Sequence, residues 1–245
     1  MIPIVTAGTV DFLPGIKALR NSWLRNSPDG FSFHVLAYGD EAFAGQLDDL
    51  GIDYLLNPVL PARLPRHDSR VCAAMYATIL VPELFQQPKS IFIDADAIIL
   101  KPLDDLIVDM HGKACAGTLH ETCVSEHVIG WDRKGRGAWT SVVVYDRSAW
   151  VKRGIYAKCL QAMNEDKYYF KCHDQSVLNL ALNLDWYLFP RDYQLQAGRE
   201  STPKLINDAY ILHFMGTKPW QEYPLHLQPA PAHKLFARKL WNQYA

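Results

Sequence analysis

Two aspartates separated by a single residue close the apolar run Ile91 to Ile93. Asp94 and Asp96 are expected at the carboxyl end of a buried strand, where ligands bind in open α/β sheets. Residues two apart in an extended backbone project to the same side, so both carboxylates can reach one cation while Ala95 leaves space for a ligand. Oxygen ligands suit Mn²⁺ or Mg²⁺, and such a cation can bridge the protein to phosphate oxygens and neutralise a departing diphosphate.

A histidine closes a second apolar run near the end of the chain. His213 follows Ile211 and Leu212, and Gly216 and Lys218 come soon after it. A neutral imidazole is a good transition-metal ligand, so His213 can complete a mixed oxygen and nitrogen shell that suits Mn²⁺ better than Mg²⁺. Gly216 allows the backbone to approach a phosphate, and Lys218 supplies a point charge to it. The two segments together predict a metal and diphosphate site.

Short β-rich runs alternate with helical stretches, which is typical of an α/β domain with a mostly parallel sheet. The pattern predicts strands at 2–6, 33–38, 53–56, 91–93, 142–145 and 209–213, and helices at 12–24, 41–50, 69–80 and 176–184. Residues 118–138 are rich in glycine, histidine and charge, which indicates a mobile loop or lid over a site. We interpret residues 1–245 as one domain, in which residues 224–245 form a helical C-terminal tail.

The composition excludes several classes of protein. Lysine and arginine total 25 against 26 acidic residues, so no overall charge excess favours nucleic-acid binding. The five cysteines include no pair at Cys-x-x-Cys spacing, which predicts reduced thiols and a cytoplasmic protein. No run approaches the roughly 18 to 20 apolar residues that span a bilayer, although peripheral membrane contact stays compatible with the sequence. The oligomeric state is left open.

The two site segments resemble the Asp-x-Asp and His-x-x-Gly-x-x-Lys-Pro-Trp motifs of glycosyltransferase family 8. That family includes glycogenin and bacterial lipopolysaccharide galactosyltransferases. The resemblance implies a single-domain, Rossmann-like GT-A fold with a mixed central sheet flanked by helices. It also implies a nucleotide-sugar donor, a UDP-sugar in our expectation, a manganese cofactor, and transfer to a glycan or other hydroxyl acceptor with retention of anomeric configuration.

Other segments carry the resemblance along most of the chain. The opening run with Thr6 and Ala7 resembles the family's first strand, whose end holds the nucleoside. The segment from His173 to Asn179 resembles the family's Asp-Gln-x-x-Leu-Asn motif, which lies beside the transferred sugar. Asp174 and Gln175 are therefore the expected catalytic residues. Asp174 can bind sugar hydroxyls and the neutral Gln175 can lie beneath an oxocarbenium-like sugar, with helix capping by Asp174 as the structural alternative.

The sequence departs from the family pattern at three places. Thr78 stands where many members have an arginine, so Arg70 is our candidate for reaching the diphosphate instead. Residues 139–141 read Trp-Thr-Ser where the family has Asn-Ala-Gly, which bears on the identity of the donor sugar. The spacing from His213 to Lys218 is one residue shorter than in the family. The long C-terminal region of many relatives is also largely missing, so a divergent related GT-A family is a second interpretation.

Three other functions fit parts of the pattern. A haloacid-dehalogenase-like phosphatase also uses Asp-x-Asp after an apolar strand, but usually near the N-terminus, and gives the segment around His213 no role. A sugar-nucleotide pyrophosphorylase-like nucleotidyltransferase should open with a basic, glycine-rich loop, whereas residues 7–11 read Ala-Gly-Thr-Val-Asp. A catalytically inactive carbohydrate-binding module would not need Asp94, Asp96 and His213. The glycosyltransferase is the function that uses all of these residues.

Overall fold

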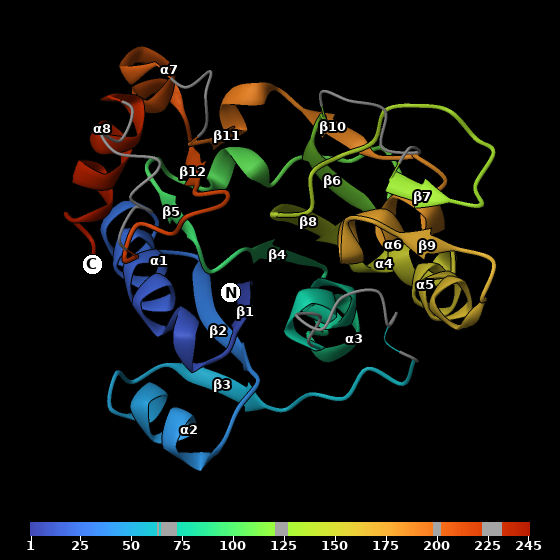
Figure 1. Ribbon diagram of the computed structural model, residues 1–245, viewed down its shortest axis with the longest axis horizontal. Coiled ribbons are helices and arrows are strands. Elements are labelled where there is room, and N and C mark those ends of the chain that lie inside the picture. The colour runs from blue at the N-terminus through green and yellow to red at the C-terminus, as the bar shows by residue number, and fades with distance from the viewer. Residues whose placement is uncertain (63, 65–72, 121–126, 198–201, 222–231) are drawn as a thin grey trace.

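A seven-stranded mixed sheet runs through the middle of the molecule (Figure 1). The computed structural model describes every residue except 63, 65–72, 121–126, 198–201 and 222–231. In sheet order the strands are β10 (Tyr187–Phe189), β6 (Cys115–Thr118), β8 (Val142–Asp146), β4 (Lys89–Ile93), β1 (Ile2–Gly8), β2 (Phe31–Ala37) and β3 (Asp53–Leu56). Strands β1 to β4 are parallel to one another where they pair, and β8 is antiparallel to both β4 and β6. The expected mixed sheet flanked by helices is confirmed.

Apolar side chains cover both faces of this sheet. Ile4 and Ile91 pack on one face with residues of the first two helices, whereas Val5 and Phe92 pack on the other with residues of the later helices. The alternation follows from the strand period of two, and it explains why the central strands are apolar almost throughout. The helices are α1 (Leu13–Asn26), α2 (Glu41–Asp48), α3 (Val81–Leu84), α4 (Arg147–Lys152), α5 (Ile155–Asn164), α6 (His173–Ala181), α7 (Pro203–Asp208) and α8 (Ala232–Trp241).

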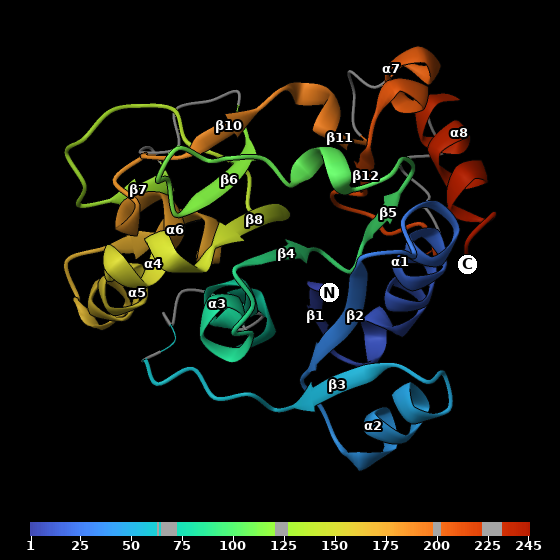
Figure 2. The ribbon, with the colours of Figure 1, turned by 180° about the vertical axis from the view of Figure 1, so that it is seen from behind.

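A second, three-stranded sheet adjoins the main one at the carboxyl end of β4. Its order is β11 (Gln194–Gln196), β12 (Ile211–His213) and β5 (Ala97–Ile99). Strand β12 pairs parallel to β11 and antiparallel to β5. Helices α1 and α8 lie side by side at this end of the molecule, and α4, α5 and α6 gather at the opposite end, as both views show (Figures 1 and 2). None of the helices in the described part of the chain has the length and apolar character needed to cross a bilayer.

Two local expectations need correction. Residues 73–80 form a 3₁₀ helix that leads into α3, whereas 69–72 lie outside the described residues. Pro82 has no N–H to bond to the carbonyl of Thr78, and the Tyr145 hydroxyl donates to that carbonyl instead at 2.8 Å. The expected loop at 118–138 also contains strand β7 (Val128–Ile129), which pairs antiparallel with β9 (Tyr169–Phe170) and so orders part of the segment.

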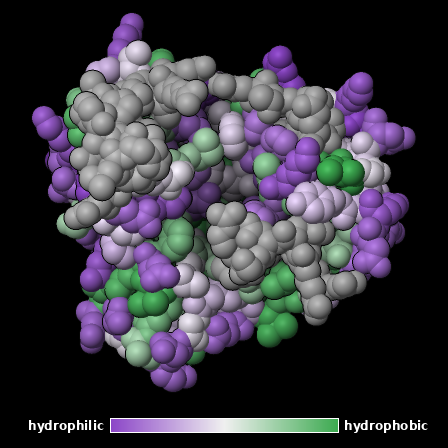
Figure 3. Space-filling view, viewed as in Figure 1, coloured by the Kyte–Doolittle hydropathy of each residue, from purple (hydrophilic) through white to green (hydrophobic). Residues whose placement is uncertain are grey.

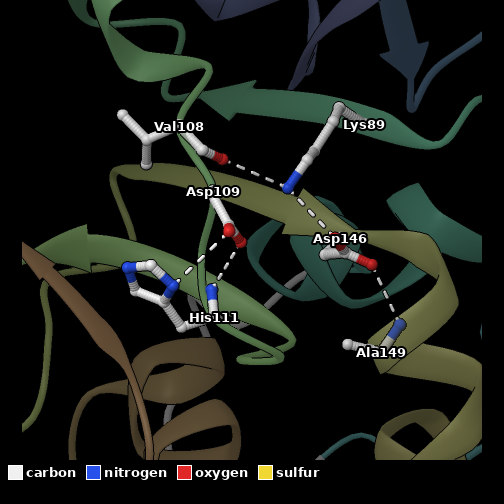
Figure 4. A network of polar contacts seen from close by, with 6 residues as sticks. All are labelled: Lys89, Val108, Asp109, His111, Asp146 and Ala149. Carbon is white, nitrogen blue, oxygen red and sulfur yellow. Dashed lines mark hydrogen bonds and ion pairs between the residues drawn. The ribbon is translucent and has the colours of Figure 1, made fainter.

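An ion pair fixes the end of the sheet opposite the small sheet. Lys89 Nζ, at the start of β4, lies 3.0 Å from the carboxylate of Asp146 and 3.4 Å from the carbonyl of Val108 (Figure 4). Asp146 also accepts a hydrogen bond from the backbone N–H of Ala149 at 2.9 Å, which makes it the N-cap of α4. One carboxylate therefore anchors both a central strand and a helix.

We expect Asp146→Ala to lower the free energy of unfolding by about 1–2 kcal/mol at neutral pH, because α4 loses its cap. Burial raises the pKa of Asp146, but the hydrogen bonds from Ala149 and Lys89 outweigh burial and hold the pKa below its usual value. A carboxylate whose pKa is lower in the folded state stabilises the protein at pH values above its unfolded-state pKa of about 3.9. This stabilisation is lost as the pH falls through the folded-state pKa.

Urea unfolding at pH 7 and pH 3 measures this effect. The difference in the free energy of unfolding between wild type and Asp146→Ala should be smaller at pH 3 than at pH 7. Asp29→Ala, at an exposed aspartate in the loop before β2, is the control and should change little at either pH. If Asp146→Ala lowers the free energy of unfolding by the same amount at both pH values, the ion-pair explanation is contradicted.

A glycine of helix α1, Gly15, lies against the turn that follows β4. A Cβ atom on Gly15 would lie 2.3 Å from the backbone oxygen of Ala95 and 2.8 Å from the ring of Trp220. The backbone oxygen cannot rotate away as a side chain can, so only glycine permits this approach. In contrast, a Cβ on Gly45 of α2 meets nothing within 4 Å.

The two glycines make a matched pair of variants. In a helix interior, Gly→Ala ordinarily stabilises by about 1 kcal/mol, and this is the expected result for Gly45→Ala. For Gly15→Ala we expect a loss of about 1–3 kcal/mol, because the turn must shift to admit the methyl group. Chemical denaturation of both variants measures the contrast. Equal stabilisation by the two substitutions would show that α1 does not press on the turn.

Candidate active site

The Asp94–Asp96 segment is a tight turn that carries the chain from the main sheet into the small one. The N–H of Ala97 donates to the carbonyl of Asp94 at 3.1 Å and closes the turn. The N–H of Asp94 donates to Ser141 at 2.9 Å, and the N–H of Phe214 donates to the carbonyl of Asp96 at 2.9 Å. The extended backbone expected from the sequence is therefore wrong for this segment. The carboxylates converge because the turn brings them together.

His213 reaches the turn through the small sheet. It is the last residue of β12, and the antiparallel register pairs it with Ala97, the residue directly after Asp96. Its Nε2 lies 3.1 Å from Asp96 Oδ1 and 3.6 Å from Asp94 Oδ2. One ligand atom from each of these three residues lies within 4.8 Å of the others. The structure thus brings together all three predicted metal ligands.

This donor set fits a divalent cation. Two carboxylates and one imidazole nitrogen are suitable ligands for Mn²⁺. Mg²⁺ is the alternative, although it prefers oxygen ligands. His213 directs one nitrogen at both carboxylates, and its other nitrogen, Nδ1, is buried without a hydrogen-bond partner among the described residues. The side chain of Asp96 is only 7% exposed, so its negative charge requires nearby positive charge.

The three side chains perturb one another strongly. Burial and the neighbouring Asp96 raise the pKa of Asp94 to about 7. Burial also raises the pKa of Asp96, but His213 and Lys218 outweigh burial and hold that pKa at about 2. Burial lowers the pKa of His213, whereas Asp96 and Asp94 together raise it above its usual value. A bound cation would favour the ionised carboxylates and the neutral imidazole that coordination needs.

Lys218 supplies the second positive charge of the site. Its ammonium group contacts Asp96 Oδ2 and lies 5.8 Å from the centre of the Phe12 ring. The spacing from His213 to Lys218 is one residue shorter than the family motif, and the ammonium still reaches the turn. Gly216 has a left-handed backbone with φ of +78° and is exposed, so a close approach to a phosphate stays a prediction.

A pocket opens beside the turn at the carboxyl ends of β1 and β4. Figure 3 shows hydrophilic side chains around a hollow near the middle of the face shown. Among the predicted site residues, the pocket lining includes Ala7, Ala95 and Lys218 together with the acidic residues Asp94, Asp96 and Asp174. The sequence missed the remaining lining residues, which are Gly8, Thr9, Phe12, Ala74, Met75 and Phe92. Phe12 and Met75 offered no signal, because apolar residues on helical segments ordinarily indicate a core.

One predicted nucleotide-site residue does not line the pocket. Thr6 is fully buried, and its hydroxyl has no hydrogen-bond partner in the described part of the chain. The pocket begins one residue later, at Ala7. Arg70 lies outside the described residues. At the family's arginine position, the hydroxyl of Thr78 instead contacts the hydroxyl of Tyr145 in the core.

Asp174 and Gln175 belong to the first turn of α6, which begins at His173 and not at Ser176 as the sequence predicted. Cys172, rather than Asp174, is the N-cap residue. Asp174 lines the pocket, where burial and the nearby Asp94 raise its pKa to about 8, although hydrogen bonds from Thr140 and the helix backbone act to lower it. The Gln175 amide is buried and lies 3.5 Å from His127 Nδ1.

The Trp-Thr-Ser departure contributes to the site through two of its three residues. Thr140 binds the Asp174 carboxylate, and the carbonyl of Ser141 accepts the hydrogen bond from Asp94. Trp139 stacks on the buried His120 ring, with ring centres 3.8 Å apart. From the sequence, this segment was recognisable only as a departure from the family's Asn-Ala-Gly pattern. Its contacts became evident once β8 placed it beside β4.

The chain spans less than two thirds of the length of the curated relatives it matches. General stress protein A of Bacillus subtilis (strain 168) is 28% identical over 184 residues, which are 64% of this chain and 63% of that protein. Glycosyltransferase GlyF of Streptococcus pneumoniae is 21% identical over 161 residues, which are 62% of this chain and 39% of that protein.

Solved structures share the fold at low identity. The bifunctional glycosyltransferase WbbM matches with a TM-score of 0.73 and 16% identity, over 90% of this chain and 47% of that one. The galactosyltransferase LgtC, in complex with donor and acceptor sugar analogs, matches with a TM-score of 0.67 and 17% identity, over 100% of this chain and 96% of that one. The expected GT-A fold is confirmed.

The family model of glycosyl transferase family 8 matches residues 3–223. This range includes the Asp94–Asp96 turn, the first turn of α6, His213 and Lys218. The match to this family does not favour the phosphatase or the pyrophosphorylase-like alternative. The chain belongs to glycosyl transferase family 8.

Proposed function

We propose that the protein is a metal-dependent glycosyltransferase that moves a sugar from a nucleotide-sugar donor to a hydroxyl group of a glycan or other acceptor. The observation that carries the proposal is the convergence of Asp94, Asp96 and His213 beside a pocket at the carboxyl ends of β1 and β4. Family membership adds to it, because the range that matches the family model includes all three residues.

The three ligands would hold Mn²⁺, or Mg²⁺ in its place. When bound, the cation supplies charge that neutralises the departing diphosphate. Lys218 is the protein's own contribution to that neutralisation. Its ammonium contacts Asp96, and a diphosphate bound at the turn would offer it oxygens within the same region.

We propose UDP-linked sugars as donors, with the nucleoside beside Ala7, Gly8 and Thr9. Arg70 stays our candidate for a further diphosphate contact. The free thiols of Cys115, Cys159 and Cys172 agree with a reducing environment, and we propose the cytoplasm as the location. The near-balanced charge gives no support to a nucleic-acid partner.

We further propose that transfer retains the anomeric configuration. Inversion needs a carboxylate placed to deprotonate the acceptor. Asp174 is the candidate, but its hydrogen bonds from Thr140 and the α6 backbone occupy it and suit a role in holding sugar hydroxyls. Gln175 stays the proposed neutral neighbour of the reacting carbon, and a substrate would have to draw its amide away from His127.

The metal assignment predicts the behaviour of Asp96→Asn. The amide keeps the shape of the side chain but loses the charge. We expect Mn²⁺-dependent UDP affinity to fall by at least about 100-fold, since even outer partners of metal ligands contribute about 10–100-fold. Isothermal titration calorimetry with UDP, with and without Mn²⁺, measures it. Asp109→Asn is the charge-matched control, because Asp109 is 82% exposed. Unchanged Mn²⁺-dependent affinity in Asp96→Asn would remove Asp96 from the metal site.

The stereochemical proposal predicts an α-linked first product from an α-linked UDP-sugar. Proton NMR of the glycoside that forms first, before any slow equilibration, distinguishes the two outcomes. Asp174→Ala should reduce turnover more than Gln175→Ala, because Asp174 lines the pocket whereas the Gln175 amide contacts His127. A β-linked first product would refute retention and make Asp174 the candidate base.

A further inference from the structure

Unpartnered polar atoms are concentrated on one face of the small sheet. They are Oε1 of Gln194, both carboxamide atoms of Gln196, and Nδ1 of His213. All are buried, and none has a hydrogen-bond partner within the described chain. An unsatisfied buried polar group costs about 1–3 kcal/mol, so such a group in a native structure needs an explanation. Here several occur together, and one belongs to a proposed metal ligand.

The strand register places Gln196 next to His213. In the parallel β11–β12 ladder, Gln196 pairs with His213 and Gln194 pairs with Ile211. Paired residues in a ladder project to the same face of a sheet, so the carboxamide and the imidazole are neighbours. On the other side of His213 the paired residue is Ala97, which offers only a methyl group. Gln196 is thus the polar side chain that the sheet itself provides to this ring.

The chemistry of His213 calls for an acceptor at this position. Its Nε2 faces Asp94 and Asp96. An imidazole that binds a metal through Nε2 carries its proton on Nδ1, and that N–H ordinarily donates to a carbonyl, a carboxylate or a water. A carboxamide oxygen can accept this bond, and a buried water with two to four polar partners can transmit it.

Gln194 links the same face to the turn. Its Nε2 donates to the hydroxyl of Ser141, and the carbonyl of Ser141 accepts the N–H of Asp94 at 2.9 Å. The Oε1 atom of Gln194 then remains available on the face that carries Gln196. The two glutamines therefore form a polar surface beside His213, on one face of the small sheet.

We propose that Gln196 is a positioning residue for His213. Its carboxamide oxygen accepts the Nδ1–H of His213 through one buried water, which fixes the tautomer that presents Nε2 to the cation. Gln194 Oε1 is a further partner of that water. The inference rests on the proposed function, because it assigns Gln196 a role in the metal site of that function.

Gln196→Met tests the proposal, because methionine keeps the length of the side chain without its polar atoms. We expect Mn²⁺ to bind about 10–100-fold more weakly, the range found when an outer partner of a ligating histidine is lost. The variant should stay folded, since the removed amide has no direct hydrogen bond to another described residue and loses only its bond to the water; the thermal unfolding midpoint checks this. Binding is measured without UDP, by the electron paramagnetic resonance signal of free Mn²⁺. Gln161→Met, at an exposed glutamine of α5, is the control.

A second measurement reports on the ring itself. Long-range ¹H–¹⁵N spectra of the Mg²⁺-loaded protein show the tautomer of His213, whose signals are identified by their loss in His213→Asn. The wild type should show the Nδ1–H form alone, and Gln196→Met a mixture. Gln196→Leu repeats both measurements should the methionine variant unfold at a lower temperature.

The outcomes separate the two proposals. Should the wild type bind Mn²⁺ and Gln196→Met bind it equally well with the same tautomer, the role of Gln196 is overturned and the proposed function stands. Should the wild type not bind Mn²⁺, with or without UDP, the metal site is overturned and the role of Gln196 with it.

Discussion

The turn at Asp94–Asp96 is held by backbone hydrogen bonds from three directions. One closes the turn, one ties it to Ser141 before β8, and one ties it to Phe214 after β12. These bonds use main-chain groups, so they leave both carboxylates free to face the pocket. Since β8 and β12 belong to different sheets, the turn can keep its shape only while the two sheets stay in contact.

This constraint concentrates negative charge where the protein has few ways to balance it. Asp94, Asp96 and Asp174 all line one pocket, and Lys218 is the basic residue among the described residues of that lining. Burial raises the pKa of Asp94 and Asp174, whereas Asp96 stays ionised through His213 and Lys218. The divalent cation that we propose would make this unfavourable concentration of negative charge favourable, and perturbed pKa values of this kind cluster at functional sites.

The sequence was sufficient to predict those elements whose residue pattern lies within one short segment of the chain. The alternation of apolar residues predicted the strands around β1 to β4, and Asp-x-Asp at the end of β4 predicted two carboxylates that converge with His213. The strand β5 and its pairing with β12 could not be predicted, because the register joins residues far apart in the chain and three-residue strands have no clear period. The start of α6 was misplaced because its N-cap residue is Cys172, which makes no side-chain capping hydrogen bond and so leaves no capping signal in the sequence.

The aromatic contacts of the C-terminal helix extend the site beyond the pocket. Trp241 of α8 packs against Trp220, with ring centres 5.3 Å apart, and against Phe214, at 5.2 Å. These two residues flank the segment that carries Lys218. Any local opening of α8 would therefore release the loop that holds the site's lysine. By reciprocity, a ligand that holds Lys218 in place must also protect α8 from opening, so slowed amide exchange in a helix outside the pocket would report occupancy of the site.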